Sequence, residues 1–236
     1  MKSKFLSLLL SGVFVLTCFA FSSTTLMAKK RIVFGGGPDG GTFQVVANGV
    51  QVYKPVKALK DYTIKAQSSA GSIENLRKVD RNRSQLGEVY SEHVYLGRNG
   101  MLKNDTNRYE NVLAVAFLYE APEQLVIRKG SGIKNPEDLV GKKVGVGNAG
   151  SGAFANCELF FNHLGIWDRV ERNAMGYNDA AAAFGNKQLD AFWLFTAFPS
   201  GAVIMAAQTN DIGLIDLGAW ARNSDFFFRK VSLFQQ

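Results

Sequence analysis

Three loops rich in glycine and hydroxyl-bearing residues carry the clearest chemical signal in this sequence of 236 residues. Each loop follows a predicted strand and opens a predicted helix, and the three span residues 35–42, 68–72 and 147–152. The first backbone N–H groups of a helix have no partner inside it, so an anionic group is favoured there. Three such helix ends converging on one cleft, with no evident catalytic set beside them, indicate a receptor for a small carboxylate or phosphate ligand.

The candidate ligand contacts come from these loops and from the ends of neighbouring predicted strands. They are Gly36, Gly37, Gly41, Thr42, Phe43, Ser68, Ser69, Ser72, Tyr90, Asn148, Gly150, Ser151, Gly152, Thr196 and Pro199. The glycines equally suit ordinary tight turns, and the serines equally suit N-caps, although a capped helix end still offers further N–H groups. Tyr90 equally suits the rim of the cleft. Thr196 and Pro199, together with Phe195, equally suit core packing.

Other chemistries have weaker support. The spacing Gly35-x-Gly37-x-x-Gly40 matches the dinucleotide fingerprint, but the next strand ends in Gln-Ser-Ser at 67–69, where a ribose-binding acid is needed. No Ser/His/Asp order typical of a catalytic triad and no His/Cys metal spacing is evident. Four glutamates are interpreted as surface or hinge residues: Glu88, Glu92, Glu120 and Glu123. We therefore expect no catalytic residues, no metal and no cofactor.

Residues 1–28 have the pattern of an export signal. Two lysines form a positive start, residues 5–21 are mostly apolar, and Ala28 suits the position before a cleavage site. A membrane anchor or a buried helix is the alternative, but polar interruptions leave fewer than the ~20 clean apolar residues that a spanning helix needs. Cys18 would suggest a lipid anchor, yet the preceding threonine fits a lipobox poorly. The sequence thus predicts a periplasmic protein whose mature chain begins at Lys29.

The mature chain is mildly basic and has one cysteine. The predicted signal holds two lysines and no acidic residue, so its removal lowers the formal net charge from +7 to +5. The basic residues are dispersed, without a basic run interleaved with aromatics, which argues against a nucleic-acid partner. Cys157 has no partner for an internal disulfide and is expected to be a small buried residue.

Strand and helix signals alternate along the mature chain, as in a parallel, doubly wound α/β fold. Two such halves joined near residues 117–123 predict a first lobe over 29–118 and a second over 119–217, followed by a tail at 218–236. In open α/β sheets the ligand binds beyond the C-terminal ends of the strands, which is where all three loops lie. We therefore expect the ligand to bind in a cleft between the two lobes. The predicted strands are 31–36, 62–67, 85–90, 142–147, 171–177, 189–195 and 212–217, and the predicted helices are 42–53, 72–79, 91–98, 151–164, 178–186 and 200–209.

Four blocks of the sequence resemble one known family. They are Gly41-Thr42-Phe43, the block Ser68 to Leu76, the run from Ser131 to Gly152, and Leu189-Asp190-Ala191-Phe192 followed by Pro199-Ser200-Gly201. Together they resemble the TAXI family, the extracytoplasmic solute receptors of TRAP transporters, and they occur in the family's order.

The resemblance implies a two-lobed type II periplasmic-binding-protein fold that closes as a monomer on a small organic anion. An amino acid such as glutamate or a dicarboxylate-like compound is the implied ligand, and a TRAP membrane permease is the implied partner. Phe43 departs from the family in lacking a hydroxyl, and Ala70 replaces a glycine. The family's C-terminal return segment into the first lobe has no counterpart, so residues 218–236 are interpreted as a truncated or divergent tail. An exported enzyme or sensor on the same fold, or a non-functional truncated remnant, is the alternative.

Overall fold

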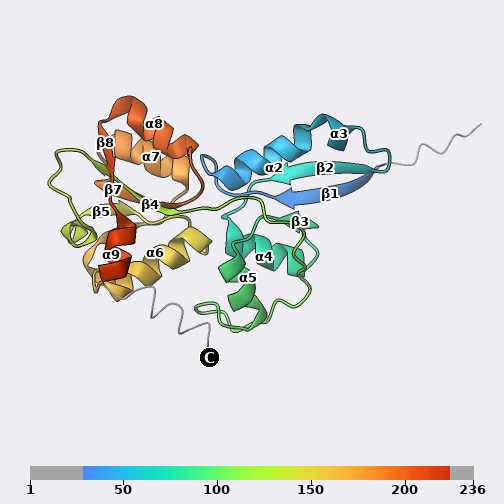
Figure 1. The fold of residues 1–236 in the computed structure, drawn as a ribbon, viewed down its shortest axis with the longest axis horizontal. Helices are drawn as coiled ribbons and strands as arrows, with labels where there is room; N and C mark the ends of the chain where they lie inside the picture. Colours follow the sequence, from blue (N-terminus) through green and yellow to red (C-terminus); the bar gives the residue numbers. More distant parts are fainter. Residues whose placement is uncertain (1–28, 224–236) are drawn as a thin grey trace, which may run out of the picture.

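The computed structural model describes residues 29–223, which form two α/β lobes joined by an extended connection (Figure 1). The predicted signal peptide and the part of the tail beyond Asn223 lie outside the described residues. The first lobe contains β1 (Lys30–Gly35), α2 (Thr42–Val52), α3 (Lys54–Lys57), β2 (Tyr62–Gln67), α4 (Ser72–Asp80), β3 (Leu86–Gly87) and α5 (Ser91–Arg98). The second contains β4 (Glu123–Arg128), the 3-10 helix η1 (Pro136–Leu139), β5 (Lys143–Gly145), α6 (Gly152–His163), the 3-10 helix η2 (Trp167–Arg169), β6 (Glu171–Asn173), α7 (Tyr177–Gly185), β7 (Ala191–Phe195), α8 (Gly201–Thr209), β8 (Ile212–Leu214) and α9 (Leu217–Asn223).

The first sheet has the strand order β2-β1-β3, and its strands run parallel. β1 pairs with β2 along its whole length, whereas β3 contributes only two residues, opposite Phe34 and Gly35. The strand predicted over 85–90 is therefore much shorter, because the chain leaves the sheet after Gly87 and Tyr90 already serves as the N-cap of α5. Helices α2 and α3 lie on one side of this sheet and α4 and α5 on the other, and the C-terminal ends of β1 and β2 point toward the second lobe (Figure 1).

The second sheet has the order β6-β5-β7-β4-β8 and is mixed rather than parallel. β5 runs parallel to β6 and β7, but β4 runs antiparallel to β7 and β8. The parallel prediction is wrong for β4, because this strand enters from the connection between the lobes without a preceding crossover helix to reverse its direction. Helices α7 and α8 lie on one side of the sheet and α6 and α9 on the other, so the predicted doubly wound layering is present (Figure 1).

The two lobes differ in the size of their cores. In the second lobe, Trp193 is 1 % exposed, and its ring lies 5.8 Å from that of Phe160 and 5.7 Å from that of Phe161. Cys157 is buried in the same cluster, as predicted, and burial raises the pKa of its thiol. The buried cluster of the first lobe is smaller and consists of Ile73, Leu76, Leu102, Tyr109 and Val112. The second lobe therefore has the larger hydrophobic core of the two.

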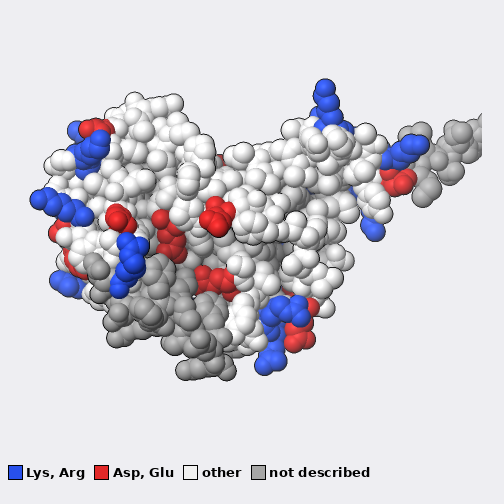
Figure 2. All heavy atoms as spheres, in the orientation of Figure 1, with Lys and Arg blue, Asp and Glu red and all other residues white. Residues whose placement is uncertain are grey.

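The charged side chains on the face shown in Figure 2 form no basic stripe. Lysine and arginine lie scattered around the periphery of this face, whereas a nucleic-acid-binding surface needs clustered positive charge. Among residues 29–223, the helices are too short or too polar to cross a membrane.

The connection between the lobes contains an extended apolar segment, residues 113–118, that no other described residue covers. Leu113, Val115 and Phe117 are 85 %, 83 % and 82 % exposed. No hydrogen bond joins this segment to another residue of the 29–223 range. An exposed apolar chain with open backbone donors and acceptors is a template for pairing with a second chain.

We expect this segment to cause concentration-dependent self-association, which light scattering on a size-exclusion column would measure. Val115→Lys places a charge in the middle of the segment and should shift the protein toward the monomer. Val45→Lys is the matched control, because Val45 is also exposed, at 64 %, but lies on α2. A wild-type protein that stays monomeric at every concentration, or an equal response of both variants, would contradict this prediction.

Candidate ligand-binding site

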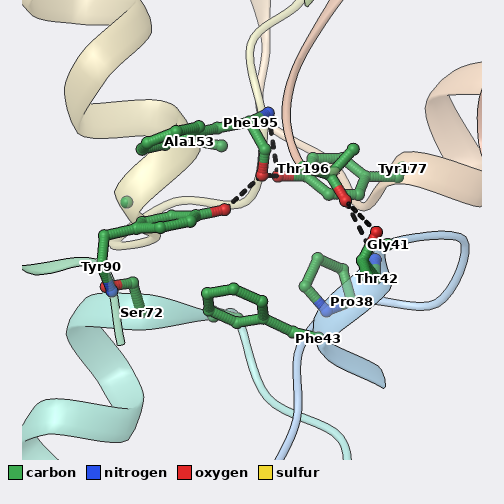
Figure 3. A pocket seen from close by; sticks show the side chains of 13 residues that line it. Pro38, Gly41, Thr42, Phe43, Ser72, Tyr90, Ala153, Tyr177, Phe195 and Thr196 are labelled. Atoms are coloured by element: carbon green, nitrogen blue, oxygen red, sulfur yellow. Dashed lines mark hydrogen bonds between the residues drawn. The ribbon is translucent and has the colours of Figure 1, made fainter. Parts of the chain in front are cut away.

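A small cavity lies between the two lobes, where loops at the C-terminal ends of their strands meet (Figure 3). It measures about 10 Å³, which is room for a single water molecule. The lining residues are Pro38, Gly41, Thr42, Phe43, Ala70, Gly71, Ser72, Tyr90, Gly152, Ala153, Tyr177, Phe195 and Thr196. Because none of these residues carries a formal charge, backbone and hydroxyl dipoles are the groups that can meet a charged ligand here.

The N-termini of α4 and α6 face each other across this cavity, one from each lobe. A β-carbon placed on Gly152 would lie 3.1 Å from Cβ of Ser72 and 2.4 Å from Cε1 of His93, so only glycine permits this approach. No acceptor among the described residues reaches the backbone N–H groups of Ser72, Ile73, Gly152 and Ala153. Free N–H groups at the positive ends of two helix dipoles form an anion site that needs no cationic side chain.

One backbone N–H at the N-terminus of α2 is bound by the opposite lobe. Its N-cap, Gly41, has no side chain, and the backbone N–H of Thr42 donates instead to Oγ1 of Thr196 over 2.9 Å. The Thr196 hydroxyl donates in turn to Oγ1 of Thr42 over 3.1 Å. Oγ of Ser200 donates to the carbonyl oxygen of Gly40 over 3.1 Å. The first loop therefore holds the two lobes together.

Aromatic side chains form one wall of the cavity. The Tyr90 ring stacks on the Phe195 ring of the other lobe, with centroids 3.7 Å apart, and its hydroxyl donates to the Phe195 carbonyl oxygen. The Tyr177 hydroxyl donates to the same oxygen over 3.0 Å and accepts the Phe195 N–H over 3.2 Å. Phe43 contacts Tyr90 with centroids 4.8 Å apart. Burial raises the pKa of both phenols, so they stay protonated and act as donors.

The structure brings part of the predicted set of site residues to the cavity. These are Gly41, Thr42, Phe43, Ser72, Tyr90, Gly152 and Thr196. Others support the loops from behind, since the hydroxyls of Ser68 and Ser69 donate to the carbonyls of Gly37 and Gly36 over 3.0 and 2.9 Å. Ser151 is the N-cap of α6, and its Oγ accepts the backbone N–H of Phe154 over 3.0 Å.

The remaining predicted residues lie outside the cavity lining. The backbone carbonyl of Asn148 accepts the backbone N–H of Ser151 in the third loop over 3.0 Å. Gly150 has a φ of 75°, a backbone conformation that favours glycine. Pro199 follows a cis peptide bond next to the contact between Ser200 and the first lobe. Contact of any predicted residue with a ligand stays a prediction.

Sequence reasoning missed several lining residues, of which Tyr177 and Gly71 matter most. Tyr177 is the first residue of α7 and directly follows Gly176. The signal in the sequence that could have found it is a glycine between the end of a strand and the start of a helix. Gly71 is the N-cap of α4 with φ 121° and ψ −149°, a conformation that is essentially restricted to glycine. The strand–loop–helix pattern located its loop but not this strained position.

A serine–histidine pair lies beside the cavity, which the sequence did not indicate. Oγ of Ser72 lies 2.9 Å from Nδ1 of His93 and also accepts the backbone N–H of Tyr90 over 3.0 Å. Both side chains are 1 % exposed, so the hydroxyl has no room for a substrate and the pair instead fixes α5 against the start of α4. Within residues 29–223, no group of three or more His, Cys, Asp or Glu side chains is placed to share a metal ion.

Glu88 is buried, which corrects the surface part of its interpretation as a surface or hinge residue. It is 5 % exposed, and its Oε2 accepts the hydroxyl of Tyr119, on the connection between the lobes, over 2.5 Å. No described group hydrogen-bonds to its Oε1. Burial raises the pKa of Glu88 to about 7, against the opposing effect of the Tyr119 hydrogen bond. The carboxyl group thus ties the interlobe connection to the end of β3.

Comparisons with known proteins agree on the fold. The model of the NMT1-like family matches residues 34–224. A protein of Bordetella bronchiseptica RB50 is 20% identical with a TM-score of 0.58, over 79% of this chain and 56% of that chain, so this chain spans about half its length. The binding protein component of an ABC phosphonate transporter from Pseudomonas aeruginosa is 15% identical with a TM-score of 0.53, over 80% and 65% of the two chains. A putative L-cystine ABC transporter protein from Listeria monocytogenes is 16% identical with a TM-score of 0.51, over 86% and 90%.

We expect Glu88 to make the folded state less stable as the pH rises. The unfolded chain loses this proton near pH 4.5, whereas the folded chain holds it to about pH 7, so stability falls between these values. Glu88→Gln should remove that slope and raise the free energy of unfolding at pH 8 by about 1–3 kcal/mol relative to wild type. Urea denaturation at pH 5 and pH 8 measures the effect, with Glu120→Gln, an exposed glutamate of the connection, as the control. Equal pH slopes for wild type and Glu88→Gln would contradict it.

Proposed function

We propose that this chain, which belongs to the NMT1-like family, is an extracytoplasmic solute-binding receptor for a small organic anion. The observation that carries the proposal is the pair of helix N-termini, from α4 and α6, that meet across the cleft with free N–H groups. One helix comes from each lobe, so an anion held by both bridges the lobes and stabilises their contact. The proposed ligand contacts are the members of the predicted set that line the cavity, centred on Ser72 and Gly152.

A neutral lining favours a carboxylate on an organic body over a bare multivalent ion. Two helix N-termini supply partial positive charge equivalent to roughly half an elementary charge each, which together match one carboxylate. The aromatic rings of Phe43 and Phe195, which line the same cavity, then face the organic part of the ligand. An amino acid such as glutamate, or a dicarboxylate-like compound, is the ligand class that the TAXI resemblance adds to this chemistry.

Contact between the two lobes distinguishes the ligand-bound state of the receptor from the free state. A ligand that touches both lobes shifts the population toward the state in which they meet, by as much as its extra affinity for that state. A membrane permease would recognise this state and accept the ligand. The TAXI-like sequence blocks support a TRAP-type secondary transporter as this partner. The names of the similar Pseudomonas and Listeria structures make an ABC importer the second candidate.

The compartment and the working unit follow from the same proposal. Residues 1–28 would direct export to the periplasm, and the cleft is built from a single chain, so a monomer suffices to bind. An exported enzyme or a sensor on the same fold is the alternative. The buried Ser72–His93 pair gives the enzyme no accessible nucleophile, which favours the receptor.

A thermal-shift screen with a closure-blocking variant tests this proposal. Amino acids, dicarboxylates and small phosphates are added to wild type, and a ligand at about 100 times its Kd should raise the Tm by several degrees. Gly152→Ala should abolish the shift, because the new β-carbon meets His93 and Ser72 of the other lobe. Gly49→Ala is the matched control, since a β-carbon on this α2 glycine meets nothing within 4 Å.

Each outcome of the screen has a defined meaning. A carboxylate-specific shift in wild type and Gly49→Ala that is lost in Gly152→Ala supports a receptor that closes on its ligand. A shift that survives in Gly152→Ala places the ligand elsewhere and contradicts the site. A cooperative melt of wild type with no shift from any organic anion contradicts the function.

A further inference from the structure

We propose that the Tyr90 side chain occupies part of the ligand's own position, so that the ligand enters by displacing the Tyr90 phenol. From this we infer the ligand class, a flat ring that carries both an acidic group and a hydrogen-bond donor. The inference rests on the receptor function proposed above, and it names an aromatic carboxylate as the organic anion in place of the glutamate-like ligand that the TAXI resemblance adds. The internal occupancy itself rests only on the geometry of the cleft.

Tyr90 is a side chain of the first lobe that reaches into the second lobe. It is the N-cap residue of α5, yet its hydroxyl donates to the carbonyl oxygen of Phe195 at the end of β7. Its ring stacks on the Phe195 ring with centroids 3.7 Å apart and planes 20° apart. Figure 3 shows the Tyr90 ring extending across the cavity, with the Phe195 ring on one side and Phe43 on the other. A flat ring held between walls in this way has the geometry of a bound ligand.

The free space left beside Tyr90 is too small for an organic ligand. The remaining cavity of about 10 Å³ accommodates a single water molecule. Entry of a larger molecule requires the lobes to separate, and separation breaks the contact between Tyr90 and Phe195 because these residues lie on opposite lobes. When the lobes meet again around a ligand next to α4 and α6, the ligand and the phenol compete for one volume.

The groups that the phenol leaves behind define what replaces it. The Phe195 carbonyl oxygen loses one of its two hydroxyl donors and can accept a new one, while Tyr177 keeps supplying the other. The rings of Phe43 and Phe195 lose a flat partner, which another aromatic ring replaces best. The backbone N–H groups of Ser72 and Gly152 border the same cavity and can donate hydrogen bonds to the acidic group. A hydroxylated or amino-substituted aryl or heteroaryl carboxylate meets all three demands.

The test removes the phenol and adds it back as a free molecule. Tyr90→Ala should bind 4-hydroxybenzoate in titration calorimetry at least tenfold more tightly than wild type, and phenol should raise its Tm. Cyclohexanecarboxylate has the acid but neither a flat ring nor a hydroxyl donor, and should bind Tyr90→Ala more weakly than 4-hydroxybenzoate. Tyr53→Ala is the matched control, because Tyr53 is 61 % exposed on the first lobe, and it should behave as wild type.

Tyr90→Phe keeps the proposal testable if Tyr90→Ala does not fold. It preserves the ring but removes the hydrogen bond to Phe195, so the internal occupant is weakened and 4-hydroxybenzoate should bind about fivefold more tightly than to wild type. Folding of each variant is checked by a cooperative melt. If the folded variants bind 4-hydroxybenzoate no better than wild type, Tyr90 does not occupy the ligand position and the proposal is overturned.

The outcomes separate this proposal from the receptor function. If wild type responds to no organic anion but Tyr90→Ala binds phenol and 4-hydroxybenzoate, the internal occupancy holds and the receptor function fails. If wild type binds a carboxylate with an affinity that Tyr90→Ala and Tyr90→Phe leave unchanged, the receptor function holds and the occupancy fails. Binding of cyclohexanecarboxylate as tightly as 4-hydroxybenzoate would overturn the inferred ligand class.

Discussion

The arrangement of the cleft depends on two places where one lobe meets the other against a bare glycine backbone. At Gly152 a β-carbon would lie 2.4 Å from His93, and at Gly40 it would lie 2.2 Å from Oδ1 of Asn178. Gly40 also has a φ of 86°, a backbone conformation that residues other than glycine rarely adopt. These approaches bring the starts of α4 and α6 into one site and place Thr196 over the start of α2. Without them, each loop would be an isolated helix end, and no anion could contact both lobes.

The contacts between the lobes near the cavity are mostly neutral hydrogen bonds, which makes their separation inexpensive. A neutral hydrogen bond contributes about 1 kcal/mol net, because water replaces it when the lobes part. The exchanges between Thr42 and Thr196 and between Ser200 and Gly40 are of this kind. A receptor must open and close, so its interface has to be complementary in shape without being strongly bound. Ligand contacts of a few kcal/mol can then decide the population.

Local patterns predicted the order and type of the elements, although the strands expected over 171–177 and 212–217 end at Asn173 and Leu214. Long-range contacts explain the other differences. The strand 62–67 and the helix 91–98 have the predicted bounds, because alternation and helix starts are properties of neighbouring residues. The antiparallel direction of β4 depends on where the connection enters the second lobe, which no local pattern records. Tyr177 reaches the cavity, and Glu88 becomes buried, only because the two lobes and their connection pack together. The glycine-rich loops were recognisable because the backbone geometry of a helix start demands particular residues locally.

The unequal cores of the lobes assign them different tasks in binding. The second lobe has a mixed sheet of five strands around Trp193, and it presents the fixed acceptor, the Phe195 carbonyl. The first lobe has three strands and a smaller core, and it presents the side chain that moves, Tyr90. Rearrangement costs least where the fewest packed neighbours must be disturbed. Selectivity should therefore reside in the second lobe, whose groups keep their positions, while the first lobe adapts to whatever the second one accepts.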